Sequence, residues 1–346
     1  MPSAFSYMAF DLWRICRNLI KVLDHIKEAD MEEKIKIYAV VGPTASGKSA
    51  LALELAERYG GEIISCDSMQ VYRRMDIGTA KPTAEERARV VHHMIDIVEP
   101  EQAFSCADYV AMADRAIRDV HARGRLPIVC GGTGLYLDAL MRENDFQPDI
   151  TDNALRAEML DFAREHGAEA LHEELRKIDP ESAEATHPNN VKRVARAIEI
   201  YRLSGVTKTE LDRRSRLGGM RFDVKAVGLF YSEREELYKR IDTRVDAMIS
   251  EGLEAETRRL YEEGVFNTNA TAAQAIGYKE LLGVIEGRES LAEAVERLKL
   301  ATRRYAKRQI TWFSGKEYVK RLDVFEGKNK KTFEEIVNNA SQLFFN

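Results

Sequence analysis

The sequence predicts an α/β protein in which a parallel sheet is interrupted by a helical insertion domain. Strand-like apolar runs alternate with helical patterns between residues 36 and 141, which is typical of a parallel sheet covered on both faces. Only helical patterns follow, from residue 153 to residue 219, and a further strand pattern, VKAVGLFY, starts at residue 224. These changes suggest the following domains: an extension at 1–30, an α/β core at 31–143 and 222–322, a helical insertion at 144–221, and a C-terminal tail at 323–346.

The first 30 residues are expected to lie outside the core. Their apolar residues recur at helical spacing, so a helix docked on the core is the alternative. A second possible start, Met31, stands directly before the first strand-like run. The segment lacks the continuous apolar stretch and the small-residue cleavage site of a signal peptide.

Composition limits the classes of function. The chain has 346 residues, 45% of them hydrophobic, which is enough for a main domain and a smaller one. The net charge of −5 argues against a global basic field, so any nucleic-acid site must be a local patch. The four cysteines are scattered without C-x-x-C spacing, which indicates reduced thiols and a cytoplasmic protein. No apolar run approaches the ~20 residues of a membrane span.

The elements of the core can be assigned in order. Strands are expected at KIYAVVG, EIISCD and LPIVCG, and helices at SALALELAERYG, at FSCADYVAMADRAIRDVHARG and from GTGLYLDAL onward. Between the second strand and the second helix, MDIGTAKPT has the glycine and proline of a loop. After VKAVGLFY, helical patterns continue to about Lys307, and mixed structure follows.

The turn after the first strand carries a complete phosphate-binding motif, G-x-x-x-x-G-K-[ST]. It consists of Gly42, Pro43, Thr44, Ala45, Ser46, Gly47, Lys48 and Ser49. Its position between a strand and a helix is the context that the motif requires, and it makes the core P-loop NTPase-like. Backbone N–H groups and the helix N-terminus favour an anion there, Lys48 adds a point charge, and the Ser49 hydroxyl suits Mg²⁺. The motif indicates a diphosphate or triphosphate and does not specify ATP.

A second group of polar residues follows the second strand. Asp67 comes just past its carboxyl end, where open α/β sheets bind ligands. It is either the cap of a turn or a catalytic carboxylate. Gln70, Tyr72 and Arg73 are suited to holding a polar substrate, and Lys81 could add a cation.

Several segments together resemble the tRNA dimethylallyltransferase family, also known as tRNA isopentenyltransferases. They are GPTASGKSALALELA, EIISCDSMQVYRRMDIGTAKPT, GGTGLY, HPNN and AKRQITWF, and the similarity extends from about Lys36 to about Arg321. The resemblance implies that the loop holds the diphosphate of dimethylallyl diphosphate. The allylic group would then move to the N6 amine of the adenosine at tRNA position 37, next to the anticodon, and diphosphate would leave.

The resemblance also implies roles for single residues. Lys48, Thr44 and Mg²⁺ would stabilise the leaving diphosphate, because its charge grows as the C–O bond breaks. Asp67 would accept a proton from the N6 amine. Arg234, in YSEREELY, matches a family arginine directed at the diphosphate.

A flipped adenosine in a single-stranded loop is the form of RNA best read by side chains. Family matches and two basic patches imply tRNA contacts at Asp67, Ser68, Met69, Gln70, Thr133, Arg156, Lys192, Arg193, Arg196, Gln274, Gly277, Lys279, Lys307, Arg308, Gln309 and Trp312. A solvated basic face is the alternative for each patch, and core packing is the alternative for Trp312. The insertion patch lies on NNVKRVARAIEIYRLSG, where Val191, Val194, Ala195 and Ile198 form the apolar stripe.

Two rival functions use the same motif. A small-molecule or nucleotide kinase would place ATP on the loop, and a non-catalytic tRNA-binding protein would hold diphosphate only as a structural anion. The partners expected here are dimethylallyl diphosphate and the tRNA anticodon stem-loop. Neither a membrane nor an obligate protein partner is indicated, which is compatible with a monomer.

Overall fold

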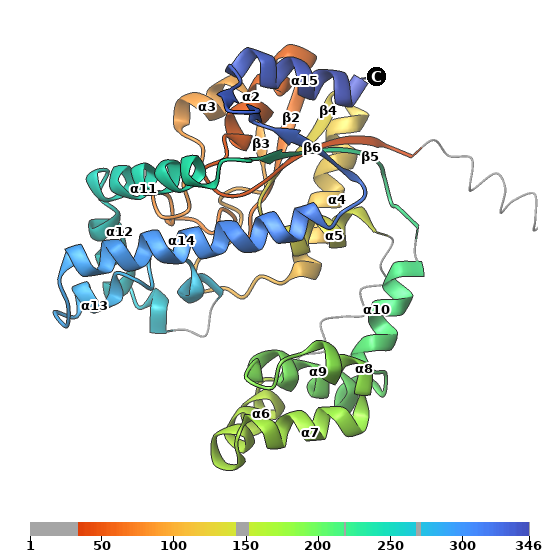
Figure 1. Ribbon diagram of the computed structural model, residues 1–346, viewed down its shortest axis with the longest axis vertical. Helices are drawn as coiled ribbons and strands as arrows, with labels where there is room; N and C mark the ends of the chain where they lie inside the picture. The colour runs from red at the N-terminus through yellow and green to blue at the C-terminus, as the bar shows by residue number, and fades with distance from the viewer. Residues whose placement is uncertain (1–33, 143–151, 218, 268–270, 346) are drawn as a thin grey trace, which may run out of the picture. The chain divides into compact units, whose positions relative to one another are not determined.

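The computed structural model describes residues 34–142, 152–217, 219–267 and 271–345. Its centre is a six-stranded parallel sheet of order β3-β2-β4-β1-β5-β6 (Figure 1). The strands are β1 (Lys36–Val41), β2 (Gly61–Cys66), β3 (His92–His93), β4 (Leu126–Gly131), β5 (Asp223–Phe230) and β6 (Val319–Asp323). The predicted α/β class is confirmed. The expectation for residues 1–30 lies outside the described residues.

Two strands of this sheet were not predicted, β3 and β6. β3 has only two residues, and β6 has the sequence VKRLD with a single buried residue, Leu322. Both lie at edges of the sheet, where one side of a strand has no neighbour and a continuous apolar run is not needed. The sequence pattern that indicates a buried strand is therefore absent from them.

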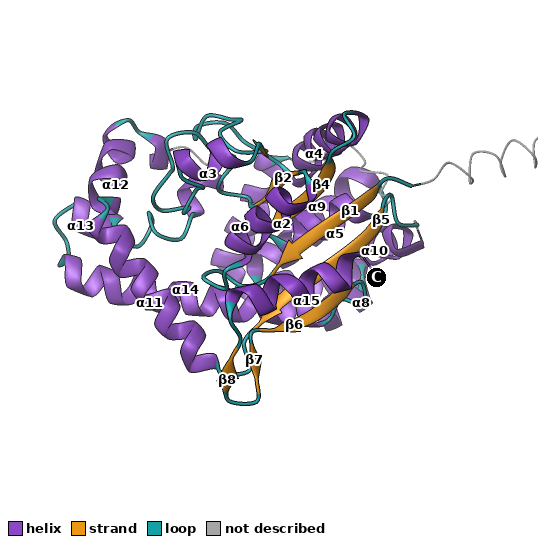
Figure 2. Ribbon diagram, turned by 90° about the horizontal axis from the view of Figure 1, so that it is seen from above, coloured by secondary structure: helices purple, strands orange, loops and turns teal. Residues whose placement is uncertain are grey.

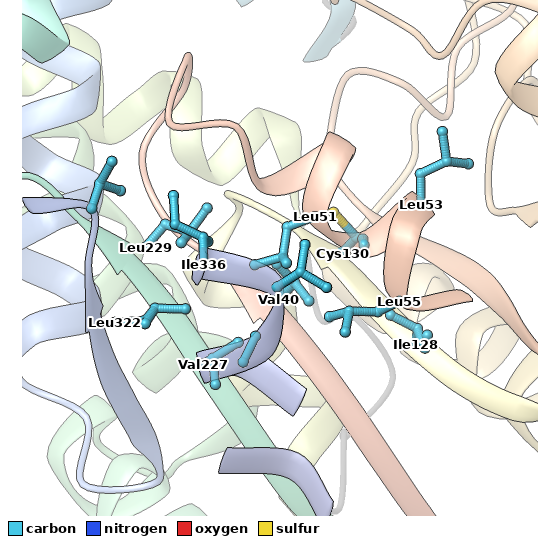
Figure 3. Close-up of a cluster of buried hydrophobic side chains, with 14 of the residues drawn as sticks. Val40, Leu51, Leu53, Leu55, Ile128, Cys130, Val227, Leu229, Leu322 and Ile336 are labelled. Carbon is cyan, nitrogen blue, oxygen red and sulfur yellow. The ribbon is translucent and has the colours of Figure 1, made fainter. Parts of the chain in front are cut away.

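Helices cover both faces of the sheet (Figures 1 and 2). On one face, α2 (Lys48–Tyr59) and α15 (Phe333–Phe345) share a core cluster with the strands. Figure 3 shows Leu51 and Leu55 of α2 and Ile336 of α15 near Val40 and Val227. On the other face lie α4 (Cys106–Ala122) and α5 (Gly134–Met141), and α3 (Ala84–Arg89) precedes β3.

The segment predicted as a C-terminal tail contains α15, and this helix packs in the core. Val337 and Phe344 are fully buried in the sheet cluster, and the ring of Phe344 lies 5.1 Å from that of Tyr38 in β1. The apolar residues of FEEIVNNASQLFF recur at helical spacing, so one face of the helix is buried. The hairpin β7 (Phe325–Glu326) and β8 (Asn329–Lys330) connects this helix to β6.

In residues 152–217, the described part of the predicted insertion, there are helices and no strand, as expected. They are α6 (Asn153–His166), α7 (Ala168–Ile178), α8 (Pro180–Ala185), α9 (Val191–Ser204) and α10 (Lys208–Leu217). This segment has an apolar cluster of its own, which includes Leu171 and Leu175 of α7 and Val194 and Ile198 of α9.

The chain after β5 forms the remaining helices. They are α11 (Arg234–Ser250), α12 (Leu253–Glu262), η1 (Val265–Asn267), η2 (Thr271–Gln274), α13 (Leu282–Ile285) and α14 (Leu291–Ser314). An ion pair joins α14 to α11, with Arg303 Nη2 2.6 Å from Asp242 Oδ2. Among the described residues, no helix combines the length and the apolar composition needed to cross a membrane.

Candidate active site

The phosphate-binding motif folds as the turn between β1 and α2, with Lys48 as the first helical residue. Gly42 and Gly47 have φ values of 147° and 94°, which favour glycine, and a Cβ on Gly42 would lie 2.9 Å from Leu229 O. Gly47 at the N-cap supplies no side-chain hydrogen bond to the first turn of α2. The first N–H groups of the helix are therefore available to an anion.

Two cations and the motif line a small cavity of about 70 Å³ at this turn. Its lining includes Thr44, Lys48, Ser49, Asp67 and Arg244. Burial lowers the pKa of Lys48 and the nearby positive charge of Arg244 lowers it further, although Asp67 opposes this. Burial also lowers the pKa of Arg244. Two desolvated cations that repel each other favour the binding of an anion between them.

Arg244 was not identified from the sequence, and Arg234, which was expected at the diphosphate, lies elsewhere on the same helix. Arg234 is exposed at the first turn of α11 and lines neither this cavity nor the larger one beside it. Arg244 lies ten residues further along the same helix, about 15 Å away along its axis. One signal could have identified it: Arg244 falls on the face of α11 that carries the buried Leu237, Ile241 and Val245. Charged residues are rarely found on the face of a helix that packs in the core, so a charge at such a position indicates a special role.

Asp67 follows the last residue of β2 and forms a turn. Its Oδ1 accepts hydrogen bonds from Met69 N at 2.9 Å and Gln70 N at 3.4 Å. The described residues offer no partner to Oδ2. The turn-cap interpretation therefore holds for one oxygen, while the other is available to a ligand in the cavity.

A second cavity, of about 280 Å³, adjoins the first and shares Thr44, Asp67, Thr79, Arg244 and Tyr305 with it. One wall is apolar and consists of Ile241, Val245, Met248 and Leu298. Seven of the residues expected to contact tRNA line this cavity: Asp67, Ser68, Met69, Gln274, Gly277, Lys279 and Arg308. Gln70 lines the smaller cavity, where its Nε2 donates to Ala80 O at 3.1 Å.

The loops at the rim of the second cavity are held by a buried carboxylate. Glu256 of α12 accepts hydrogen bonds from Ile77 N at 3.0 Å and Gly78 N at 3.2 Å, and from the Tyr278 hydroxyl at 2.6 Å. Lys81 has a structural role too, because its ammonium is buried against Asp76 and Asp96. Tyr72 is fully buried, and Arg73 pairs with Glu99. Lys81 and Tyr72 therefore shape the loop and are not free to hold a substrate, whereas Arg73 is exposed on the surface beside Glu99.

Two expected tRNA contacts are occupied by internal hydrogen bonds. Thr133 Oγ1 accepts from Ser68 N at 3.0 Å, so it orders the turn after β2. Gln309 is 5% exposed, and both ends of its amide bind backbone groups. Lys307 and Trp312 are exposed on the same helix, and Lys316 Nζ lies 4.9 Å from the centre of the Trp312 ring.

The basic patch of the insertion is divided by the buried Glu199. Its Oε2 accepts from Arg156 Nη2 at 2.9 Å and from Arg196 Nη1 at 3.0 Å, so these two arginines hold α6 and α9 together. Lys192 and Arg193 are exposed on α9. Of the predicted buried stripe, Val194, Ala195 and Ile198 are buried, and Val191 is half-buried against the same cluster.

Comparison with known proteins identifies the family. The model of the family described as IPP transferase matches residues 70–316, and that of isopentenyl transferase matches residues 35–102. The chain belongs to the IPP transferase family. It is 46% identical over 305 residues to a tRNA dimethylallyltransferase of Halalkalibacterium halodurans, covering 88% of this chain and 96% of that one. A tRNA dimethylallyltransferase of Geobacillus thermodenitrificans is 48% identical over 289 residues, with coverages of 84% and 90%.

Solved structures of the family have the same fold. The tRNA isopentenylpyrophosphate transferase of Bacillus halodurans matches with a TM-score of 0.65 at 43% identity, covering 90% of this chain and 97% of that chain. A eukaryotic dimethylallyltransferase acting on tRNA matches with a TM-score of 0.69 at 33% identity, with coverages of 85% and 75%. Membership of this family does not favour the kinase alternative.

Proposed function

We propose that this protein transfers a dimethylallyl group from dimethylallyl diphosphate to the N6 amine of adenosine 37 in tRNA and releases diphosphate. One observation carries the proposal. A small cationic cavity and a larger cavity with an apolar wall share a carboxylate, Asp67, at their junction. Such an arrangement suits a substrate with a charged leaving group and an apolar tail, attacked beside a group that can take up a proton.

The residues of the small cavity would stabilise the leaving group. As the allylic C–O bond breaks, negative charge grows on the diphosphate, and the nearby cations Lys48 and Arg244 act on that charge in a site with little water. The N–H groups at the start of α2 and the Thr44 hydroxyl would bind further oxygen atoms. Arg244 replaces Arg234 in this role.

Asp67 would serve the nucleophile. The lone pair of the exocyclic amine is delocalised into the adenine ring, so the amine is a weak nucleophile. When its nitrogen bonds to the allylic carbon, one N6 proton must leave, and Oδ2 of Asp67 would accept it. The products are N6-(dimethylallyl)adenosine in tRNA and diphosphate.

The Ser49 hydroxyl lines the small cavity and would hold Mg²⁺. The hydroxyl oxygen of Ser49 is a hard donor that suits Mg²⁺, and this ion usually keeps water and substrate phosphate oxygens as its other ligands. Burial raises the pKa of the adjacent Cys130 thiol to about 11, which keeps it neutral and a poor ligand. When bound, Mg²⁺ would neutralise charge on the diphosphate.

The protein would act as a monomer in the cytoplasm and would bind tRNA by the anticodon stem-loop. The second cavity is lined by three of the expected tRNA contacts, Arg308, Lys279 and Gln274. Two others, Lys307 and Trp312, lie on the exposed side of α14. For Arg304, Lys307 and Arg308 the described residues supply no acidic partner, so their charge is available to phosphates.

One assay tests the proposal against its rivals. Radiolabelled dimethylallyl diphosphate is incubated with unmodified tRNA and Mg²⁺, with a tRNA carrying guanosine at position 37 as the control. The expected result is label in the nucleoside of the first tRNA only. ATP consumption with no transfer of label would support a kinase, and tRNA binding with no transfer would support the non-catalytic protein.

A further inference from the structure

We propose that Gln309 is a positioning residue that fixes the phosphate-binding loop relative to the turn that carries Asp67. It is not a residue that contacts tRNA. The inference rests on the proposed function only for its assay, because the contacts themselves are features of the fold. Gln309 lies on α14, 265 residues from the loop in sequence, and reaches it through the interior.

The two ends of the Gln309 amide bind two different loops. Its Oε1 accepts a hydrogen bond from Thr44 N at 2.8 Å, and its Nε2 donates one to Gly132 O at 2.9 Å. Neither partner can reverse its role, because a backbone N–H only donates and a carbonyl only accepts. Of the side chains of this length, only a glutamine satisfies both partners: glutamate has no donor when ionised, and lysine has no acceptor.

Packing leaves the amide one position. Gln309 is 5% exposed, and a Cβ added at Gly132 would lie 2.1 Å from its Nε2. The absence of a side chain at Gly132 therefore allows the amide to reach the carbonyl. A buried amide with both groups bonded is held firmly, because breaking either bond leaves a desolvated polar group.

From Gly132 the connection continues to Asp67 through two short steps. The next residue, Thr133, donates its N–H to Cys66 O at 3.1 Å, and its Oγ1 accepts from Ser68 N at 3.0 Å. Cys66 and Ser68 are the residues on either side of Asp67. One side chain thus links the loop that would hold the leaving group to the turn that would hold the proton acceptor.

The same hydrogen bond determines what Thr44 can do. Its N–H is used by Gln309, so within the loop the anion must be bound by other N–H groups, Lys48 and the Thr44 hydroxyl. If the amide is removed, Thr44 N is left unpaired and the loop can rotate toward the ligand. A misplacement of about 1 Å in a reacting pair can cost about 10²-fold in rate.

The experiment compares Gln309→Glu and Gln309→Met with Gln342→Met, an exposed glutamine of α15 as the control for the substitution itself. Three quantities are measured: tRNA affinity, dimethylallyl diphosphate affinity, and the single-turnover rate with both substrates saturating. We expect both Gln309 variants to retain tRNA affinity within about twofold and to lose about 10- to 10²-fold in the single-turnover rate. Gln309→Glu should lose at least as much as Gln309→Met, since its carboxylate faces the carbonyl of Gly132.

A second variant approaches the same hydrogen bond from the other side. Gly132→Ala keeps Gln309 but pushes its amide away, and it should show the same loss of rate with the same tRNA affinity. The Gly132→Ala variant also tests the positioning role of Gln309 if the Gln309 variants fail to fold. A loss of tRNA affinity with a normal saturated rate, or no change in any quantity, would overturn the proposal. If the wild-type protein transfers no label, the proposed function fails instead, which is a separate result.

Discussion

At the end of β2, the two carboxylate oxygens of Asp67 have different surroundings. Oδ1 holds the turn through Met69 N and Gln70 N, and Oδ2 has no partner among the described residues. A substitution that removes both oxygens would therefore disturb the turn as well as any chemistry. Asparagine keeps the acceptor for the turn and removes the ability to take up a proton, so it separates the two effects.

We expect Asp67→Asn to lower the single-turnover rate by roughly 10²- to 10⁴-fold, as is typical for loss of a positioned acid or base. Affinity for tRNA should change far less, because the turn is preserved. Rapid-quench transfer and equilibrium tRNA binding are the measurements, and Asp67→Ala shows the added effect of losing the turn. Equal losses of rate and affinity in the asparagine variant would make Asp67 a binding residue.

Lys48 should strengthen the binding of diphosphate and lower the stability of the ligand-free protein. We expect Lys48→Met to weaken diphosphate binding and to slow the chemical step, while the free energy of unfolding without ligand rises. Burial lowers the pKa of Lys48 in the folded state below its ordinary value of 10.5, so protonation favours the unfolded chain. The penalty is fully present below the folded-state pKa of Lys48 and is lost as pH rises from that pKa to the unfolded value of 10.5.

Urea unfolding at a series of pH values tests this statement. The stability advantage of Lys48→Met over the wild type should shrink between pH 7 and pH 10.5, because the folded wild type loses its proton before the unfolded chain does. A less stable variant at pH 7 would mean that the hydrogen bond from Lys48 Nζ to Pro43 O outweighs the cost of burial.

At the scale of single elements, helix α9 combines a packed face and a basic face. Val194 and Ile198 pack in the insertion cluster, and Arg196 is bound to Glu199. Replacing Arg196 would leave Glu199 with one cation fewer in a buried site, so its loss would report on folding. Lys192 and Arg193 are exposed and are the residues to test for tRNA contact.

The double variant Lys192→Ala/Arg193→Ala should weaken tRNA binding and leave dimethylallyl diphosphate affinity unchanged. The slope of log affinity against log salt should become less steep by ~0.7 for each phosphate that the variant no longer neutralises, the value for single-stranded nucleic acid. The matched control is Arg164→Ala/Lys177→Ala, which removes the same charge from residues paired with Asp161 and Glu174. If both variants behave alike, only the net charge of the insertion matters and α9 is an ordinary solvated face.

At the scale of the whole molecule, the last helix, α15, packs against the first strand, β1, in one core cluster. Phe344 is 1% exposed and packs on Tyr38, while α15 contributes no residue to the lining of either cavity. A substitution in the core-facing side of α15 should therefore change the stability of the protein and leave the active site unchanged.

We expect Phe344→Ala to lower the free energy of unfolding by about 3–5 kcal/mol, the usual cost of removing a buried phenylalanine. The turnover number well below the melting temperature should stay near that of the wild type. Phe333→Ala, at the exposed start of the same helix, is the control and should have little effect. Denaturant unfolding and initial rates measure the two quantities. A large loss of activity in folded Phe344→Ala would show that α15 supports the active site.

Much of the fold could be predicted because its signals are local. The apolar runs of β1, β2 and β4 and the helical spacing of α4 depend on neighbours within a few residues. The short β3 and the charged β6 carry weak local signals, since a sheet edge needs little apolar surface. The pairing of β6 with β5 uses backbone hydrogen bonds, which almost any residue except proline can form, so it leaves little trace in the sequence.

The phosphate-binding loop, the position of Asp67 at a strand end and the helical insertion could all be predicted from the chain without its fold. Each depends on residues close together in sequence. The packed structure was needed to establish that Arg244 rather than Arg234 enters the cavity, that Glu199 binds Arg156 and Arg196, and that Gln309 joins two loops from the inside. These contacts join residues that are far apart in sequence or depend on how each helix is rotated in the core. A charged or amide side chain looks alike in sequence whether it faces water or a buried partner.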